Sequence, residues 1–109
     1  MRYNVILHDN FKREAKPLLK KYPSLKADLQ KLLDNIDKEL MLATDLGDGF
    51  KKIKIAIKSK GKGSSGGGRI ITHETIISIN DTNLVFGSIY NKSEYNTIDT
   101  AILKKILGM

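Results

Sequence analysis

Cysteine is absent from the 109 residues of this chain. Without thiols, the protein has no disulfide scaffold, no thiolate metal site and no cysteine nucleophile, and a reducing compartment suits it. The two histidines, His8 and His73, are far apart in the sequence, and no carboxylates cluster beside them. The sequence therefore predicts neither a metal site nor a metal cofactor. It also lacks the phosphate-binding loop of nucleoside triphosphatases and a serine nucleophile elbow.

Long apolar runs are missing as well. No run approaches the roughly 20 residues needed to cross a bilayer, and the start of the chain, MRYNVILHDNF, has too short an apolar core for a secretory signal. We expect a cytoplasmic protein without a membrane partner. The length predicts a single domain spanning residues 1–109, since we find no repeat and no linker.

Acidic residues are missing from one long segment, Phe50–Ile71. This segment carries seven positive charges, which equals the formal net charge of +7 of the whole chain. It also contains the glycine- and serine-rich loop GKGSSGGG, where a phosphate can approach the backbone closely. The segment therefore predicts a polyanionic partner such as nucleic acid.

The hydrophobic pattern predicts an α+β protein. A strand at Tyr3–His8 precedes two helices with apolar stripes, the first capped by Asp9 or Asn10 and the second by Ser24. A loop at Asp45–Gly49 then leads into strands with a period of two. The predicted segments that follow are strands at Ile53–Ile57, Arg69–Ile79 and Leu84–Tyr90 and a last helix capped by Thr97.

The predicted order of these elements is β-α-α-β-β-β-α. The three later strands are joined by connections too short for crossovers, so they form an antiparallel meander. We expect an antiparallel twisted sheet with the N-terminal helical hairpin packed on one face.

Lys52 and Lys54 are candidates for phosphate binding because residues two apart on a strand share a face. Two ammonium groups about 7 Å apart can bracket one phosphodiester. The alternative is a solvated lysine face opposite buried isoleucines. Arg69 directly follows three glycines at the start of a strand, where its planar fork can face a phosphate. Taken alone, it is equally well explained as an exposed arginine at a strand end.

The segment SIYNKSEYN supplies aromatic residues beside this basic region. Tyr90 and Tyr95 are candidates for stacking on unpaired RNA bases, and Lys92 lies between them. The alternative is that Tyr90 completes the edge of the core and Tyr95 packs on the last helix.

KKIKIAIKSKGKGSSGGGRII followed by SIYNKSEYNTI resembles the RelE/ParE toxin superfamily of bacterial type II toxin–antitoxin modules. The likeness is greatest to HigB-like and RelE-like members and extends over the chain, including the helical hairpin with KKYPS. It implies a RelE-like sheet and a metal-independent endoribonuclease, an mRNA interferase that cuts messenger RNA on the ribosome and inhibits translation.

The resemblance also implies roles for individual residues. In such enzymes the 2′-hydroxyl attacks the adjacent phosphorus, and lysines and arginines replace the usual histidine pair. Which lysine acts as the general base stays open, as does the role of His73. The implied catalytic residues are Lys52, Lys54, Arg69 and Lys92. The residues expected to bind RNA, from their charge or aromatic rings, are Lys51, Lys58, Lys60, Lys62, Tyr90 and Tyr95, of which Tyr95 also matches the base-stacking tyrosine of RelE-like members.

The implied partners are a cognate antitoxin, messenger RNA on the ribosome, and operator DNA only when the toxin is bound to its antitoxin. Two other functions fit the sequence. One is a ParE-type gyrase poison that cuts no RNA, and the other is a non-enzymatic basic module that binds nucleic acid.

Overall fold

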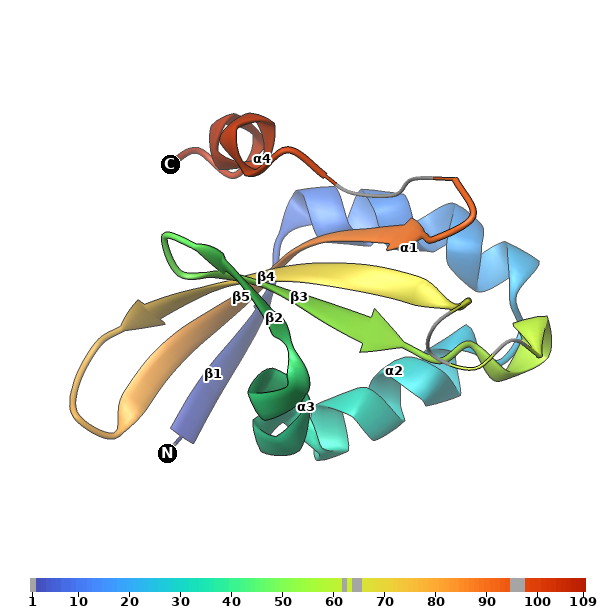
Figure 1. Ribbon diagram of the computed structural model, residues 1–109, viewed down its shortest axis with the longest axis horizontal. Helices are drawn as coiled ribbons and strands as arrows, with labels where there is room; N and C mark the ends of the chain where they lie inside the picture. The colour runs from blue at the N-terminus through green and yellow to red at the C-terminus, as the bar shows by residue number, and fades with distance from the viewer. Residues whose placement is uncertain (1, 62, 64–65, 95–97) are drawn as a thin grey trace.

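The chain forms a five-stranded sheet with helices packed against it (Figure 1). The structure, a computed structural model, describes residues 2–61, 63, 66–94 and 98–109. The fold is α+β, as predicted, and its radius of gyration of 13.3 Å is that of a compact chain of this length. The elements in chain order are β1 (Arg2–Leu7), α1 (Asp9–Lys21), α2 (Leu25–Asp34), α3 (Ile36–Leu42), β2 (Thr44–Gly47), β3 (Phe50–Ile55), the short 3-10 helix η1 (Lys58–Lys60), β4 (Gly68–Ile76), β5 (Asp81–Asn91) and α4 (Thr100–Ile106).

The sheet is mixed, which corrects the predicted antiparallel sheet. The strand order is β1-β5-β4-β3-β2, and β1 runs parallel to β5, with Val5 beside Leu84. The meander of β3, β4 and β5 is antiparallel, as expected from its short connections. Strands at opposite ends of the chain carry no local signal of how they pair, so the sequence did not reveal the parallel pair.

A short strand, β2, occupies most of the segment that was predicted to be a loop at Asp45–Gly49. Thr44 pairs with Lys52, and Asp45 pairs with Lys51. The turn into β3 is tight because Gly47, Asp48 and Gly49 all have positive φ angles. β2 is mostly exposed and has only one partly buried apolar residue, so it lacks the alternation by which a strand is recognised.

The helices also begin and end differently from the prediction. His8, rather than Asp9 or Asn10, caps α1, because its Nδ1 atom accepts a hydrogen bond of 3.0 Å from the Asn10 N–H. The predicted second helix is divided at Asn35 into α2 and α3. Asp99 caps α4, whereas the predicted cap, Thr97, lies outside the described residues.

Each face of the sheet buries its own apolar core. The helical hairpin and α3 cover one face, as predicted for the hairpin, and α4 covers part of the other. The first core consists of Phe11, Ala15, Leu18, Leu25, Leu32, Leu40, Ile53, Ile55, Ile57, Ile70, Leu84, Phe86 and Ile89. The second consists of Phe50, Ile71, Tyr90 and Leu103, with Leu46, Ile98 and Leu107 at its border. Among the described residues, none of the helices is both long and apolar enough to span a membrane.

Candidate functional site

Three of the predicted site residues form a row across the centre of the sheet. Lys54 on β3 lies directly opposite Arg69 on β4, and Arg69 lies directly opposite Tyr90 on β5. Directly opposite residues on antiparallel strands point to the same face. The face is the one that α4 partly covers, since Tyr90 packs in the same core as Leu103. Lys52 shares this face, two residues before Lys54.

Arg69 is more enclosed than the sequence predicts. Only 4% of the residue is exposed, and its guanidinium donates a hydrogen bond of 2.9 Å to the Gly68 carbonyl. Lys54, by contrast, is exposed. Two like charges directly opposite each other on neighbouring strands are unfavourable, by up to about 1 kcal/mol. An anion placed against both would remove that repulsion.

Tyr90 is also buried, with 4% of its surface exposed. Burial raises the pKa of its hydroxyl above the ordinary value, while the charge of Arg69 acts in the opposite direction. The ring packs against the apolar residues of the second core, so in this structure it presents no face on which an RNA base could stack. This placement agrees with the alternative interpretation of Tyr90 as a core residue.

Lys51 lies on the opposite face from Lys52 and Lys54. Its neighbour across the strands is Thr72, and its ammonium group forms a 3.1 Å ion pair with Glu74. The segment from Phe50 to Ile71 has no acid of its own, but β4 brings one to Lys51. The structure therefore separates Lys51 from the other predicted RNA-binding residues.

The other described lysines of the predicted site lie at one end of the molecule, where η1, the last residues of β5 and the C-terminal end of α1 meet. Lys92 follows β5 directly and is exposed, and its N–H donates a 3.1 Å hydrogen bond to the Gly67 carbonyl. Lys58 and Lys60 belong to η1. We call this region, which contains Lys21, Lys58, Lys60 and Lys92, the lysine end. Two residues predicted to contact RNA, Lys62 and Tyr95, lie outside the described residues.

η1 is tied to α2 through a buried carboxylate. Asp28 is 8% exposed, and its Oδ2 atom accepts hydrogen bonds from the Ser24 hydroxyl at 2.7 Å and from the Lys58 N–H at 3.1 Å. The Ser59 N–H also donates to the Ser24 hydroxyl at 2.8 Å. These bonds fix the backbone of η1 and leave the Lys58 side chain exposed.

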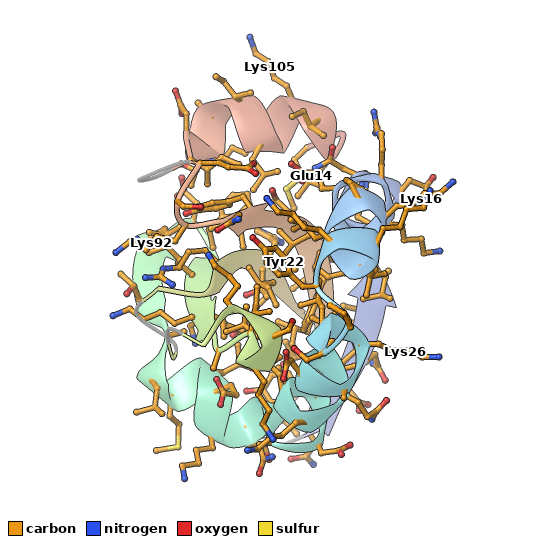
Figure 2. The ribbon with its side chains drawn as sticks, turned by 90° about the vertical axis from the view of Figure 1, so that its right-hand side faces the viewer. Glu14, Lys16, Tyr22, Lys26, Lys92 and Lys105 are labelled. Atoms are coloured by element: carbon orange, nitrogen blue, oxygen red, sulfur yellow. The ribbon has the colours of Figure 1, made fainter. Side chains whose placement is uncertain are left out.

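Sequence reasoning missed a polar cluster around Asn91. The side chain of Asn91 donates a 2.8 Å hydrogen bond to the Tyr22 hydroxyl and accepts one of 2.6 Å from the Lys60 ammonium. Figure 2 looks onto this end of the molecule and shows Tyr22 near its centre. Tyr22 and Asn91 are 69 positions apart, so no local pattern connects them.

A groove of about 500 Å³ runs beside β3, where the pairing with β2 ends at Lys52. Its walls come from β3, α2 and α3. Lysines outnumber acids in its lining, and two of them, Lys52 and Lys54, belong to the predicted site. The charged residues of the groove are Lys31, Lys38, Lys52, Lys54, Lys58, Asp28 and Glu39.

Both histidines lie away from this region. His8 caps α1. His73 packs its ring against Phe50 at 4.8 Å, and its Nε2 atom is 3.0 Å from the Asp48 carbonyl oxygen, beside the β2–β3 turn. Throughout the described ranges, no three histidine, aspartate or glutamate side chains come together as metal ligands.

Comparisons with known proteins add no assignment. No protein-family model matches the chain, and neither the curated proteins nor the solved structures contain a significant match.

Proposed function

We propose that this protein is a ribosome-dependent mRNA endoribonuclease, the toxin of a type II toxin–antitoxin pair in the RelE/ParE superfamily. The observation that carries the proposal is the placement of Lys54 directly opposite Arg69 in the row, with Lys52 on the same face. The resemblance of the sequence to RelE-like toxins supports the same assignment. The cytoplasm is the compartment in which such a protein would meet its substrate.

In the proposed reaction, a lysine amine of Lys52 or Lys54 accepts the proton of the RNA 2′-hydroxyl. The 2′-oxygen then bonds to the adjacent phosphorus, the bond from phosphorus to the 5′-oxygen breaks, and a protonated lysine returns a proton to that oxygen. The products are a 2′,3′-cyclic phosphate and a 5′-hydroxyl. Fixed cations lower the barrier because negative charge develops on the phosphoryl oxygens in the transition state.

The ribosome has a defined part in this proposal. Holding the RNA in a reactive geometry can supply several kcal/mol of the barrier, about 7–11 kcal/mol in favourable cases. A site made of lysines and one enclosed arginine gains most from a partner that positions the substrate. The free protein should then cut RNA poorly.

Induced expression in bacteria tests the proposal. We expect growth arrest by the wild type, with primer extension showing messenger RNA cuts in phase with codons. The Lys54→Gln variant should lose both effects, because it removes the exposed cation of the row. Growth arrest with intact messenger RNA and induction of the DNA-damage response would instead indicate a gyrase poison.

The burial of Arg69 favours a second candidate, a non-enzymatic basic module that binds nucleic acid. An arginine that is 4% exposed and bonded to its own backbone neighbour supplies positive potential without touching a phosphate. Arg69→Lys separates the two functions. A binding module should tolerate this change, whereas an enzyme that needs the planar fork should lose activity.

A cognate antitoxin is the partner that the proposal requires. A basic surface with a groove of this size suits an acidic segment that folds on binding. Contact with operator DNA is proposed only for the toxin–antitoxin complex. Co-expression with the neighbouring gene product should restore growth.

A further inference from the structure

Two ammonium groups converge on one aromatic ring at the lysine end. The Nζ atoms of Lys21 and Lys60 lie 5.5 Å and 5.7 Å from the centroid of the Tyr22 ring. The negative face of an aromatic ring attracts cations at such distances. Lys21 comes from the end of α1 and Lys60 from η1, so the ring collects cations from two separate segments.

The position of the ring is fixed by a buried amide. Asn91 is 2% exposed, and its Oδ1 atom accepts hydrogen bonds from the Lys60 ammonium and from Ser93, while its Nδ2 atom donates to the Tyr22 hydroxyl. One N–H of Lys60 is used in this way, and an ammonium has two more. The Tyr22 hydroxyl accepts from Asn91 and keeps its own proton to donate. The cluster therefore offers several free donors around one ring whose position is fixed.

Neither lysine of the cluster forms an ion pair among the described residues, although Glu14 and Glu94 line the hollow that Lys21 and Asn91 share. The two ion pairs found among the described residues join Lys51 to Glu74 and Lys104 to Asp48, and neither includes Lys21 or Lys60. The cluster lies at the same end of β4 and β5 as Arg69 but on the other face of the sheet, because Asn91 follows Tyr90 and pairs with Gly68, the residue before Arg69, and Tyr22 packs against the first core. A chain of phosphates that crosses the Lys54–Arg69 row would reach this cluster by passing around the ends of these strands.

We propose that Lys21, Lys60 and the Tyr22 hydroxyl form a subsite that binds a further backbone phosphate of the same single-stranded RNA that contacts Lys54 and Arg69. The ligand class rests on the proposed function. The site reads the phosphodiester and no base, since its donors are two flexible ammonium groups and one hydroxyl. Its role is to set which phosphate reaches the row.

Fluorescence anisotropy with a single-stranded RNA of about 10 nucleotides, fully 2′-O-methylated so that it cannot be cut, tests the subsite. The logarithm of the association constant falls linearly with the logarithm of the salt concentration. For a single strand, this slope becomes steeper by about 0.7 for each phosphate that the protein neutralises. We expect the Lys21→Gln/Lys60→Gln double variant to reduce this slope by about 0.7. Each single variant should reduce it by part of this amount, because both lysines serve the same phosphate.

Lys26→Gln is the matched control. It also removes a lysine visible from this end, but the Lys26 side chain points away from Tyr22 (Figure 2). Its slope should equal that of the wild type. Thermal melts establish that each variant is folded, and Tyr22→Phe, which keeps the ring, should weaken binding without changing the slope.

A double variant with the wild-type slope would overturn the subsite, and if Lys54→Gln still lowers the slope, the proposed function is untouched. A double variant that lowers the slope by twice the expected amount would show two phosphates and would also overturn the shared subsite. If the slope is reduced in the double variant and the wild-type protein does not cleave messenger RNA in cells, the subsite is supported and the nuclease is rejected.

Discussion

At the scale of single residues, strand parity decides which lysines can act together. Lys51, Lys52 and Lys54 are neighbours in the sequence, but only Lys52 and Lys54 share the face of Arg69. Lys51 lies between Thr72 on the neighbouring strand and Glu74 in its ion pair. A charge count treats the three alike, whereas the sheet gives them different environments.

Substitutions of Lys51 and Lys54 should therefore have opposite consequences. Lys51→Gln should lower the free energy of unfolding by up to about 1 kcal/mol, since it breaks a partly exposed ion pair, and should leave growth arrest intact. Lys54→Gln should leave stability unchanged or slightly raised, since it removes a repulsion with Arg69, and should abolish arrest. Denaturant titration and plate growth measure the two properties. Equal loss of toxicity in both variants would refute the assignment by face.

The burial of Tyr90 leads to a second prediction, which concerns the stability of the fold at alkaline pH. Burial raises the pKa of its hydroxyl in the folded protein, while an unfolded tyrosine titrates near pH 10. Below about pH 10, both states keep the proton, and the contribution to stability is constant. Above about pH 10, the unfolded chain loses its proton first, so the free energy of unfolding falls as the pH rises.

Denaturant titrations on both sides of about pH 10 should show this fall in the wild type and a smaller one in Tyr90→Phe. The pKa of Tyr3 is also raised, first by burial and then by Glu74, but Tyr3 is present in both proteins and cancels in the comparison. Parallel stability curves for the two proteins would contradict the prediction.

At the scale of elements, the glycine-rich loop has a packing requirement besides any contact with phosphate. A Cβ atom added to Gly67 would lie 2.1 Å from the Ile55 carbonyl oxygen, which belongs to the end of β3. The Gly67 carbonyl also accepts the hydrogen bond from the Lys92 N–H. Gly67 thus lets the start of β4 approach β3 and holds the turn that carries Lys92.

Gly67→Ala should lower the free energy of unfolding by about 1–3 kcal/mol, because backbone must move to admit the methyl group. It should also reduce RNA binding, since the movement displaces Lys92. Gly63→Asn is the control, because nothing lies within 4 Å of its Cβ position and asparagine tolerates a φ of +62°. Thermal melts and anisotropy measure both effects. A stable Gly67→Ala protein would show that β3 and β4 can separate there without cost.

At the scale of the whole molecule, the two edges of the sheet differ in how well they are protected against pairing with another copy of the chain. β2 is a short, mostly polar edge that contains Asp45. β1, at the other edge, has no charged residue from Tyr3 to Leu7, and Val5, Ile6 and Leu7 are 40%, 43% and 40% exposed. An apolar strand at an open edge is a site where copies can pair, and here a net charge of +7 opposes their approach.

Salt should therefore promote association through β1 by screening that charge. Light scattering after size exclusion should show aggregates increasing with salt in the wild type and fewer in Ile6→Lys. Met41→Lys is the control, because it adds the same charge at an 85% exposed apolar residue that belongs to α3 and not to β1. Equal protection by both substitutions would assign the effect to net charge and not to β1.

The sequence predicted those parts of the fold whose signals are local. Alternation of isoleucine and lysine located β3, and its parity correctly placed Lys52 and Lys54 on one face. The parallel pairing of β1 with β5 was missed because it depends on residues about 80 positions apart. The mostly exposed β2 gave no alternation to detect.

The candidate site was predicted in the same uneven way. The sequence identified Lys54 and Arg69, which the structure places opposite each other, but not the burial of Arg69 or the Glu74 partner of Lys51. The cluster of Tyr22 and Asn91 was out of reach, because a side-chain bond across 69 positions depends on the completed fold.

The parallel pairing of the first strand with the last one has a consequence for synthesis. Translation proceeds from the N-terminus, so β1 is made before its partner, residues 81–91, and must wait for it before it can pair. Lys54 and Arg69 can meet earlier, but the row is complete only once Tyr90 has been added. A nascent chain still held by the ribosome that makes it therefore lacks a finished site until residues 81–91 have been made.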